Sequence, residues 1–301
     1  MQLPSFLKKN AYKSPPSLLG IDLSDHYIKV AEVAWEKSAY RLINYQASSL
    51  AMGQSWADAL QDLFEKNNFT SRTACFGLNA SSVVTKNIQL DASLTEEELE
   101  IEVNERAHHY FNYPNQELLI DFEILARDKE KLELRWIAAK KSELTPKLDA
   151  LAQLGIHAAI VDIKAYAVAK FARVIAQHCL PVELNLLIHK DSTKLTWVLY
   201  DQTNLLFFKE LAASELNVAM DEILRATAEV LSNYPGTKLG CLLFSGITAA
   251  EQQKIQASIG IEVIDLTMQL NSQSWLEQYS AATIMEALIS IGLAMRVDEC
   301  R

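Results

Sequence analysis

The sequence predicts a mixed α/β protein with two similar halves. Residues 18–78 and 184–244 each show the same order of elements: three strands, a helix and one more strand. Because this order occurs twice, it favours a duplicated α/β core with a cleft between the halves. The 301 residues, 50% hydrophobic and 22% charged, are enough for a sizeable core and are typical of a globular protein.

The first copy starts with three apolar, strand-like segments. An amphipathic helix follows over 56–66, because Ala57, Leu60 and Leu63 recur at helical spacing. The four strands of this copy are expected at 18–23, 27–35, 40–47 and 73–78.

The second copy repeats this order with a longer helix, expected over 214–231. The strand after that helix is apolar throughout, which is typical of a strand buried on both faces. The four strands of this copy are expected at 184–188, 195–200, 205–209 and 239–244.

An extra block lies between the two copies. One of its helices starts within SLTEEELE, where Ser93 or Thr95 would cap the N-terminus and the acidic run Glu96–Glu98 would favour the positive end of the helix dipole. The strands of the block are expected at 83–90, 118–125, 132–138 and 157–162, and its helices at 93–111, 142–154 and 164–177.

Charge and cysteine content exclude several classes of protein. The net charge of -10 argues against nucleic-acid binding, since phosphate contacts need a basic surface. The four cysteines have no CxxC spacing, which argues against a zinc site and a disulfide framework. Cys75 and Cys241 lie in apolar strand-like runs, so we expect both to be buried.

No apolar stretch approaches the roughly 20 residues that a membrane-spanning helix needs. The N-terminus lacks the pattern of a secretory signal, so the protein is expected to stay in the cytoplasm. Residues 1–16 form a basic leader that ends in prolines. We interpret it as a tail or as a contact with a membrane surface or a partner.

One motif is a candidate for metal and phosphate chemistry. Asp22, in GIDLSD, stands where a buried strand meets a tight turn, and such an acid can hold a metal–phosphate unit with Ser24 and backbone N–H groups nearby. The plainer interpretation is an acid that ends a strand. The cluster Glu96–Glu100 and the adjacent His108 and His109 do not converge on one helix face, so no metal site is expected.

Other signatures of catalysis are absent from the sequence. It contains no P-loop, no GxGxxG and no GxSxG, and its nine glycines are dispersed. An enzyme with an ordinary active site is therefore not indicated.

Several segments resemble the type IV pilus assembly protein PilM family. The opening PSFLKKNAYKSPPSLLGIDLSDHYIKVAEV is similar to the start of that family. The block SSVVTKNIQLDASLTEEELEIEVNERAHHYFNYPNQELLIDFEIL carries its TKxIQ strand, its LxxEEL helix start, its aromatic–Tyr–Pro turn and its DFE strand, in that order. GIHAAIVDIKAYAVAKFA and the terminal helix EALISIGLAMR resemble the family as well.

The resemblance implies a fold and a division into subdomains. The fold is the actin-like, FtsA-type one, with two ribonuclease H-like halves and an inserted subdomain. The implied layout is a leader (1–16), a first subdomain (17–81 plus 141–180), an inserted subdomain (82–140) and a second subdomain (181–301).

The resemblance also implies two sites. ATP would bind in the cleft, at positions that correspond to Asp22, Ser24, Lys29, Ser192, Ser245 and Gly246. The N-terminal cytoplasmic tail of the membrane protein PilN would bind a groove between the first and inserted subdomains, lined by Val84, Ile88, Tyr110, Phe111 and Tyr113. Plain core packing is the alternative interpretation of these apolar residues.

Departures from the family pattern put the ATP site in doubt. Asp25, His26 and Tyr27 stand where the first phosphate loop has small residues, although a backbone that approaches phosphate closely needs Gly or Ser. HKDS at 189–192 replaces the second loop, Lys164 replaces an acid, and FSGIT replaces a glycine pair. The segment between His189 and Leu243 is too short for the helical subdomain that helps to enclose nucleotide in the family. We expect ATP and magnesium binding to be weak or lost and hydrolysis to be absent; the alternative is that the added positive groups hold another anion.

The predicted function is thus a pseudo-ATPase scaffold of the type IV pilus inner-membrane platform. It would lie at the inner face of the inner membrane, held there through its PilN-like partner, with other pilus assembly proteins and self-association as further contacts. Two alternatives stay open: an actin-like ATP-dependent switch, and the actin-like cytoplasmic component of a type II secretion system.

Overall fold

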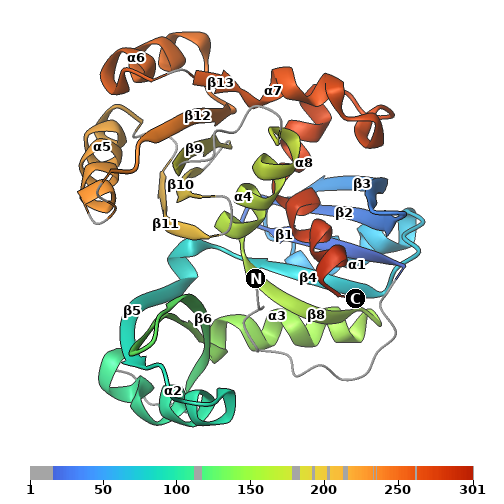
Figure 1. The fold of residues 1–301 in the computed structure, drawn as a ribbon. Coiled ribbons are helices and arrows are strands. Elements are labelled where there is room, and N and C mark those ends of the chain that lie inside the picture. The colour runs from blue at the N-terminus through green and yellow to red at the C-terminus, as the bar shows by residue number, and fades with distance from the viewer. Residues whose placement is uncertain are drawn as a thin grey trace.

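The computed structural model describes residues 16–111, 117–177, 184–191, 194–201, 204–212, 216–232, 234, 236–261 and 263–300 (Figure 1). The predicted leader lies outside these residues except for its last position. Two five-stranded sheets and one three-stranded sheet form the framework.

The first large sheet has the order β3-β2-β1-β4-β8. β1, β2 and β3 pair antiparallel, whereas β4 and β8 run parallel to β1. Its strands are β1 (Ser17–Leu23), β2 (Tyr27–Glu36), β3 (Ala39–Ser49), β4 (Thr73–Leu78) and β8 (His157–Ile163). Leu19 and Ile21 of β1 pack with Leu60 of α1 (Trp56–Lys66) and Leu151 of α3 (Lys141–Gln153), so these helices cover the outer face.

The second large sheet has the order β11-β10-β9-β12-β13, with the same pattern of antiparallel and parallel pairs. Its strands are β9 (Leu184–Lys190), β10 (Lys194–Tyr200), β11 (Leu205–Ala212), β12 (Leu239–Ser245) and β13 (Val263–Asp265). Ile223 of α5 (Leu216–Ser232) and Ile255 of α6 (Ala249–Ile259) pack on its outer face.

The predicted order of three strands, a helix and a strand is confirmed in both sheets. The helix expected over 56–66 has those bounds in the structure, and Ser55 caps it by accepting a hydrogen bond from the Asp58 amide. Sequence reasoning missed α6 and β13. β13 has three residues, too few for a periodic pattern, and α6 places one fully buried apolar side chain on the sheet.

The block between the copies forms the three-stranded sheet, in the order β5-β7-β6, together with α2. These elements are β5 (Val83–Asp91), α2 (Glu96–Phe111), β6 (Leu118–Arg127) and β7 (Lys131–Lys140). Leu99 and Val103 of α2 pack against Trp136 of β7, so the unit has its own apolar core. Thr95, not Ser93, caps α2, because Thr95 and Glu98 exchange hydrogen bonds.

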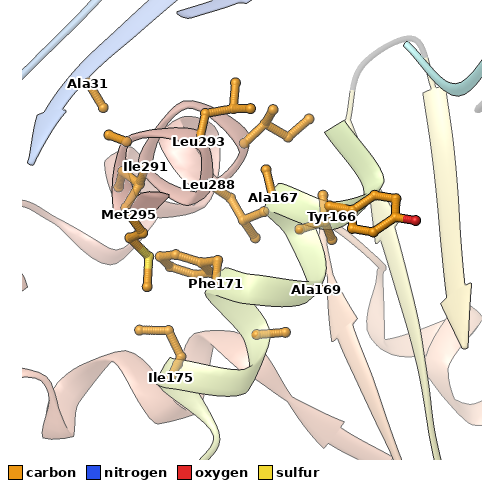
Figure 2. Close-up of a cluster of buried hydrophobic side chains, with 14 of the residues drawn as sticks. Ala31, Tyr166, Ala167, Ala169, Phe171, Ile175, Leu288, Ile291, Leu293 and Met295 are labelled. Carbon is orange, nitrogen blue, oxygen red and sulfur yellow. The ribbon is translucent and has the colours of Figure 1, made fainter. Parts of the chain in front are cut away.

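Two helices fill the space between the large sheets. α4 (Lys164–Ile175) and α8 (Ala281–Ala294) lie side by side in the centre of the molecule (Figure 1). Figure 2 shows their contact, with Phe171 of α4 close to Leu288, Ile291 and Met295. The same cluster takes in side chains from both sheets, and it is the largest of the four apolar cores described.

The central helices approach their neighbours at the level of the backbone. A Cβ atom at Gly292 of α8 would lie 2.2 Å from the carbonyl oxygen of Ala167 on α4. A Cβ atom at Gly20 of β1 would lie 1.9 Å from the carbonyl oxygen of Ser290 on α8. Both distances are far below van der Waals contact, so the packing of α8 requires glycine at position 292 in α8 itself and at position 20 in β1.

The C-terminal segment returns to the first sheet. After α7 (Leu266–Gln269) and the short 3-10 helices Leu270–Ser272 and Ser274–Leu276, α8 leads into a last 3-10 helix, η6 (Met295–Glu299). Arg296 of η6 pairs with Asp162 at 3.3 Å, and Asp298 pairs with Lys170 of α4 at 2.7 Å. These ion pairs fix the end of the chain to β8 and α4.

Arg135 connects the three-stranded unit to both neighbours. Its guanidinium pairs with Glu123 of β6 at 3.0 Å and donates to the Tyr166 hydroxyl of α4 at 3.1 Å. It also donates to the carbonyl oxygens of Leu205 and Leu206 on β11, at 2.6 and 2.7 Å. Because Arg135 is buried, these bonds replace those that water would make.

Two further expectations concern composition. Cys75 is fully buried in β4, as predicted, while the side chain of Cys241 on β12 lies outside the part of the structure that is described. In the described ranges, no helix combines the length and apolar character that crossing a bilayer would require.

We predict that Gly292→Ala destabilises the protein although alanine favours helices by about 1 kcal/mol. The added methyl group would force α8 away from Ala167, and overpacking of this kind costs about 1–3 kcal/mol. Urea unfolding gives the change, with Ala282→Ser on the exposed face of α8 as the control. A rise in the free energy of unfolding of Gly292→Ala would contradict the close contact.

Candidate functional site

A cleft of about 550 Å³ lies where the turns β1–β2 and β9–β10 face each other, beside α8. Its walls combine acidic, basic and apolar groups. It is lined by Asp22, His26, Tyr27, Lys29, Ser49, His189, Lys190, Asp191, Gly246, Met285, Glu286 and Ile289. A smaller cavity of about 310 Å³ adjoins it through Gly246 and Met285 and extends to Asp265.

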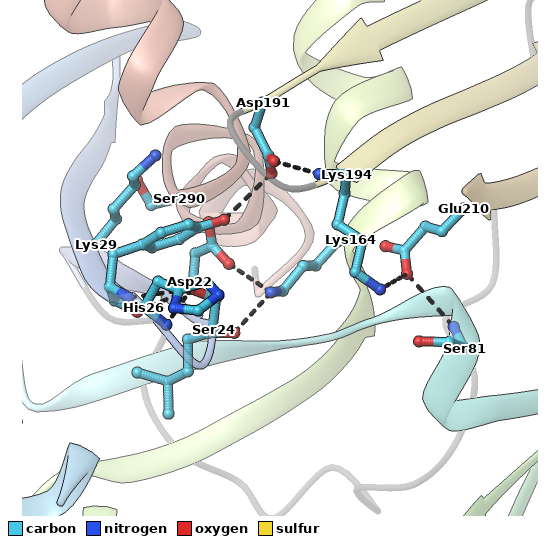
Figure 3. Close-up of polar contacts among 12 residues, drawn as sticks. Asp22, Ser24, His26, Lys29, Ser81, Lys164, Asp191, Lys194, Glu210 and Ser290 are labelled. Atoms are coloured by element: carbon cyan, nitrogen blue, oxygen red, sulfur yellow. Dashed lines mark hydrogen bonds and ion pairs between the residues drawn. The ribbon is translucent and has the colours of Figure 1, made fainter. Parts of the chain in front are cut away.

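Asp22, the predicted metal–phosphate residue, lies at the floor of this cleft. Parallel pairing sets it beside Gly77 of β4, and its side chain is 1% exposed. One carboxylate oxygen lies 2.6 Å from the ammonium of Lys164, the first residue of α4 (Figure 3). The acid is thus neutralised by a second buried side chain from its own half of the molecule.

Ser24 shapes the β1–β2 turn instead of facing an open loop. Its hydroxyl oxygen accepts hydrogen bonds from the backbone amides of His26 and Tyr27, at 3.2 and 3.1 Å. This is the local pattern by which serine fixes a turn. The hydroxyl and the two amides that a phosphate would use are therefore bonded to one another.

Tyr27 and Asp191 join the two halves across the cleft. The Tyr27 hydroxyl donates to a carboxylate oxygen of Asp191 at 3.2 Å (Figure 3). The other oxygen of Asp191 accepts from the backbone amide of Lys194 at 2.7 Å, which closes the β9–β10 turn. Burial, with Asp22 and Asp191 nearby, raises the pKa of Tyr27, so this phenol stays protonated as a donor.

Lys29 and Gly246 also lie in the cleft, as the sequence predicts, but both have partners inside the protein. The Lys29 ammonium donates to the backbone oxygen of Glu286 at 3.1 Å and lies 4.2 Å from the centre of the Tyr27 ring. Gly246 has φ +74°, and a Cβ atom there would lie 1.9 Å from the carbonyl oxygen of Lys190. Packing against the β9–β10 hairpin thus accounts for this glycine.

Contacts near the second turn were missed by sequence reasoning. Lys190 pairs with Glu251 at 2.7 Å, and Glu251 also completes a capping box with Thr248 at the start of α6. The pattern Thr248–Glu251 was the available signal for this helix start. Two other predicted positions, Ser192 and the side chain of Ser245, lie outside the described residues.

The predicted groove residues separate into exposed and buried positions. Val84 on β5 is 54% exposed, whereas Ile88 and Phe111 are 9% and 8% exposed and belong to the core between α2 and the three-stranded sheet. Core packing therefore accounts for Ile88 and Phe111, and their direct contact with a partner is not supported. Tyr113 and the side chain of Tyr110 lie outside the described residues, so their groove role stays a prediction.

His189 is a buried residue of the cleft lining near the end of β9. Burial lowers the pKa of His189 to about 4, with Lys29 acting in the same direction and Asp191 and Asp22 opposing it. The imidazole is therefore neutral at physiological pH. Across the residues that the structure describes, no group of three or more His, Cys, Asp and Glu side chains is placed to hold a metal ion.

Two sheets of equal strand order, with a cleft between them and two helices behind it, define an α/β protein of the actin-like ATPase fold. A solved Bacteroides thetaiotaomicron protein of unknown function with that fold is 10% identical, with a TM-score of 0.52 over 92% of this chain and 96% of the other. The sequence model for type IV pilus assembly protein PilM matches residues 20–186, more than half of the chain. The chain belongs to this family.

Two more solved structures share the fold. A chain of a PilM-PilN type IV pilus biogenesis complex is 17% identical, with a TM-score of 0.73 over 95% of this chain and 99% of that one. The cytoplasmic domain of EpsL, an inner membrane component of the type II secretion system of Vibrio cholerae, is 12% identical, with a TM-score of 0.50 over 88% of this chain and 97% of that one.

We predict that His189 makes the protein less stable in acid. A histidine whose pKa is lower in the folded than in the unfolded protein contributes its full stability at a pH above the unfolded pKa of 6.5. This contribution is lost as the pH falls from 6.5 towards the folded pKa of about 4. The full shift corresponds to about 3 kcal/mol. Urea unfolding between these pH values should show a smaller acid-induced loss of stability in His189→Gln than in the wild type. Equal losses in the two proteins would contradict the buried neutral state.

Proposed function

We propose that this chain is a non-catalytic scaffold of the type IV pilus inner-membrane platform. Its partner is the N-terminal cytoplasmic tail of a PilN-like membrane protein. Membership of the PilM family carries this proposal. Similarity over nearly the whole chain to a protein solved in a PilM-PilN complex supports it.

The junction between the first large sheet and the three-stranded sheet is the proposed docking region. In the sheet order of the described residues, β5 is an edge strand beside β7, so its outer edge is suited to strand addition by an extended peptide. Val84 is the second residue of β5, and β5 directly follows the connection Ala80–Ser82 that leaves the first sheet. An apolar side chain that is 54% exposed at this place is an anchor for a tail that binds by strand addition.

The contacts within the cleft support a function without hydrolysis. A magnesium–nucleotide unit does not fit the groups present, because Asp22 is paired with Lys164 and Ser24 is bonded within its own turn. Tyr27 and Asp191 bond to each other between the two turns. We therefore propose that ATP is neither bound tightly nor cleaved.

Binding of the tail would also determine where the protein acts. The partner is anchored in the inner membrane, so a chain that holds its cytoplasmic tail lies at the inner face of that membrane. In this proposal, membrane association comes from the partner and needs no membrane-spanning helix in the scaffold.

The expected result of calorimetric titration with a peptide of the PilN N-terminal tail is saturable binding. Val84→Asp should weaken it at least about tenfold, because a charge replaces the apolar anchor. Ile101→Asp on α2 is the matched control, since Ile101 is apolar and 58% exposed on the same unit but on a different element. An equal loss of peptide affinity in both variants would refute the proposed docking region. No peptide binding by the wild type would refute the proposed partner.

A second titration, with magnesium–ATP, should give no saturable heat. Among the residues described at the two turns, Asp22 is ion-paired and Tyr27 is bonded to Asp191, so these side chains are already engaged within the protein. Tight ATP binding that is lost in Asp22→Ala would overturn the non-catalytic assignment and favour a nucleotide-dependent switch.

A further inference from the structure

Lys164 is an unusual residue for its place in the fold. It is the first residue of α4, and its side chain is 4% exposed. The N-terminus of a helix carries partial positive charge and favours acids, so a lysine there is placed against the helix dipole. A buried ammonium in this position requires strong oxygen partners.

Two oxygen atoms at the end of β1 provide these partners. The Lys164 ammonium lies 2.6 Å from a carboxylate oxygen of Asp22 and donates to the carbonyl oxygen of Leu23 at 2.7 Å (Figure 3). Both oxygens contact the same Nζ atom, so they converge on one point. A carboxylate and a carbonyl are also the ligands that hard divalent cations prefer.

The fold makes room for the lysine stem. On the neighbouring strand β4, a Cβ atom at Gly77 would lie 3.1 Å from Cγ of Lys164 and 2.8 Å from a methyl carbon of Leu293. A larger residue at Gly77 would therefore press on the stem of Lys164 from one side. The position of Lys164 is thus built from three elements, β1, β4 and α4.

We propose that Lys164 is a tethered cation that occupies a latent divalent-cation site formed by Asp22 and Leu23. The ammonium supplies the positive charge that a metal ion would otherwise bring to the floor of the cleft. Because it is covalently attached, the site is always filled and does not respond to magnesium. Removal of the lysine head group should open the site.

The geometry of the cleft suits the replacement of the Lys164 ammonium by a magnesium ion. Asp22 lines the cavity of about 550 Å³, so water can reach its carboxylate once the ammonium is gone. Magnesium keeps several waters and needs one or two carboxylates from protein. Asp22, the Leu23 carbonyl and waters from the cleft can therefore complete its coordination.

The test compares thermal unfolding of the full chain with and without divalent cation. For Lys164→Ala we expect the Tm to rise by about 3 °C in about 10 mM MgCl₂, as for a ligand that binds the native state with millimolar affinity. NaCl of equal ionic strength should not reproduce the rise. The wild type should not respond to MgCl₂.

Two variants serve as controls. Asp22→Asn combined with Lys164→Met removes both charges at similar volume, and it should fold without any magnesium response. Lys190→Ala removes a cleft lysine that pairs elsewhere, with Glu251, and should behave like the wild type.

Each outcome for Lys164→Ala decides the proposal. A rise in Tm specific to magnesium, or folding that occurs when magnesium is added, supports a latent cation site. A folded variant with no magnesium response, or a variant that stays unfolded in magnesium, overturns it and leaves Lys164 as a structural ion pair. The test is independent of tail binding, so its failure would not affect the proposed partner.

Discussion

The contact between α8 and its neighbours is the constraint on which the rest of the structure depends. Both large sheets bury one face against the central pair of helices, so their separation is set by how closely these helices pack. Backbone contact at Gly292 and Gly20 fixes that distance. The cleft follows from it, because the β1–β2 and β9–β10 turns come within hydrogen-bonding reach only when the sheets are this close.

Charge within the cleft is balanced by the protein itself. Asp22 has Lys164, Lys190 has Glu251, and Asp191 accepts from Tyr27 and from the backbone. A buried charge without a partner is costly, so these pairs let charged residues line a cavity in the absence of a ligand.

Much of the fold could be predicted because periodicity is a local property. The helix Trp56–Lys66 has a clear apolar face and a serine cap, whereas β13 is too short to show any period. The site was less accessible to sequence reasoning. Asp22, Lys29 and Gly246 were placed in the cleft by motif, but the pairing of Asp22 with Lys164 depends on how α4 packs between the sheets. Ile88 and Phe111 show the reverse problem, since an apolar residue in a strand or helix looks the same in a core and in a groove.

Arg135 gives the chain a mechanical property that its division into three sheets would not suggest. One guanidinium bonds at once to β6, to α4 and to β11, so movement of the three-stranded unit away from α4 or β11 breaks some of these bonds. Such a separation would leave the buried Arg135 guanidinium without some of its hydrogen-bond partners, which is costly. The three units should therefore open together, as a single cooperative body, and a pull on the edge strand β5 would be carried through β7 and Arg135 to the far sheet.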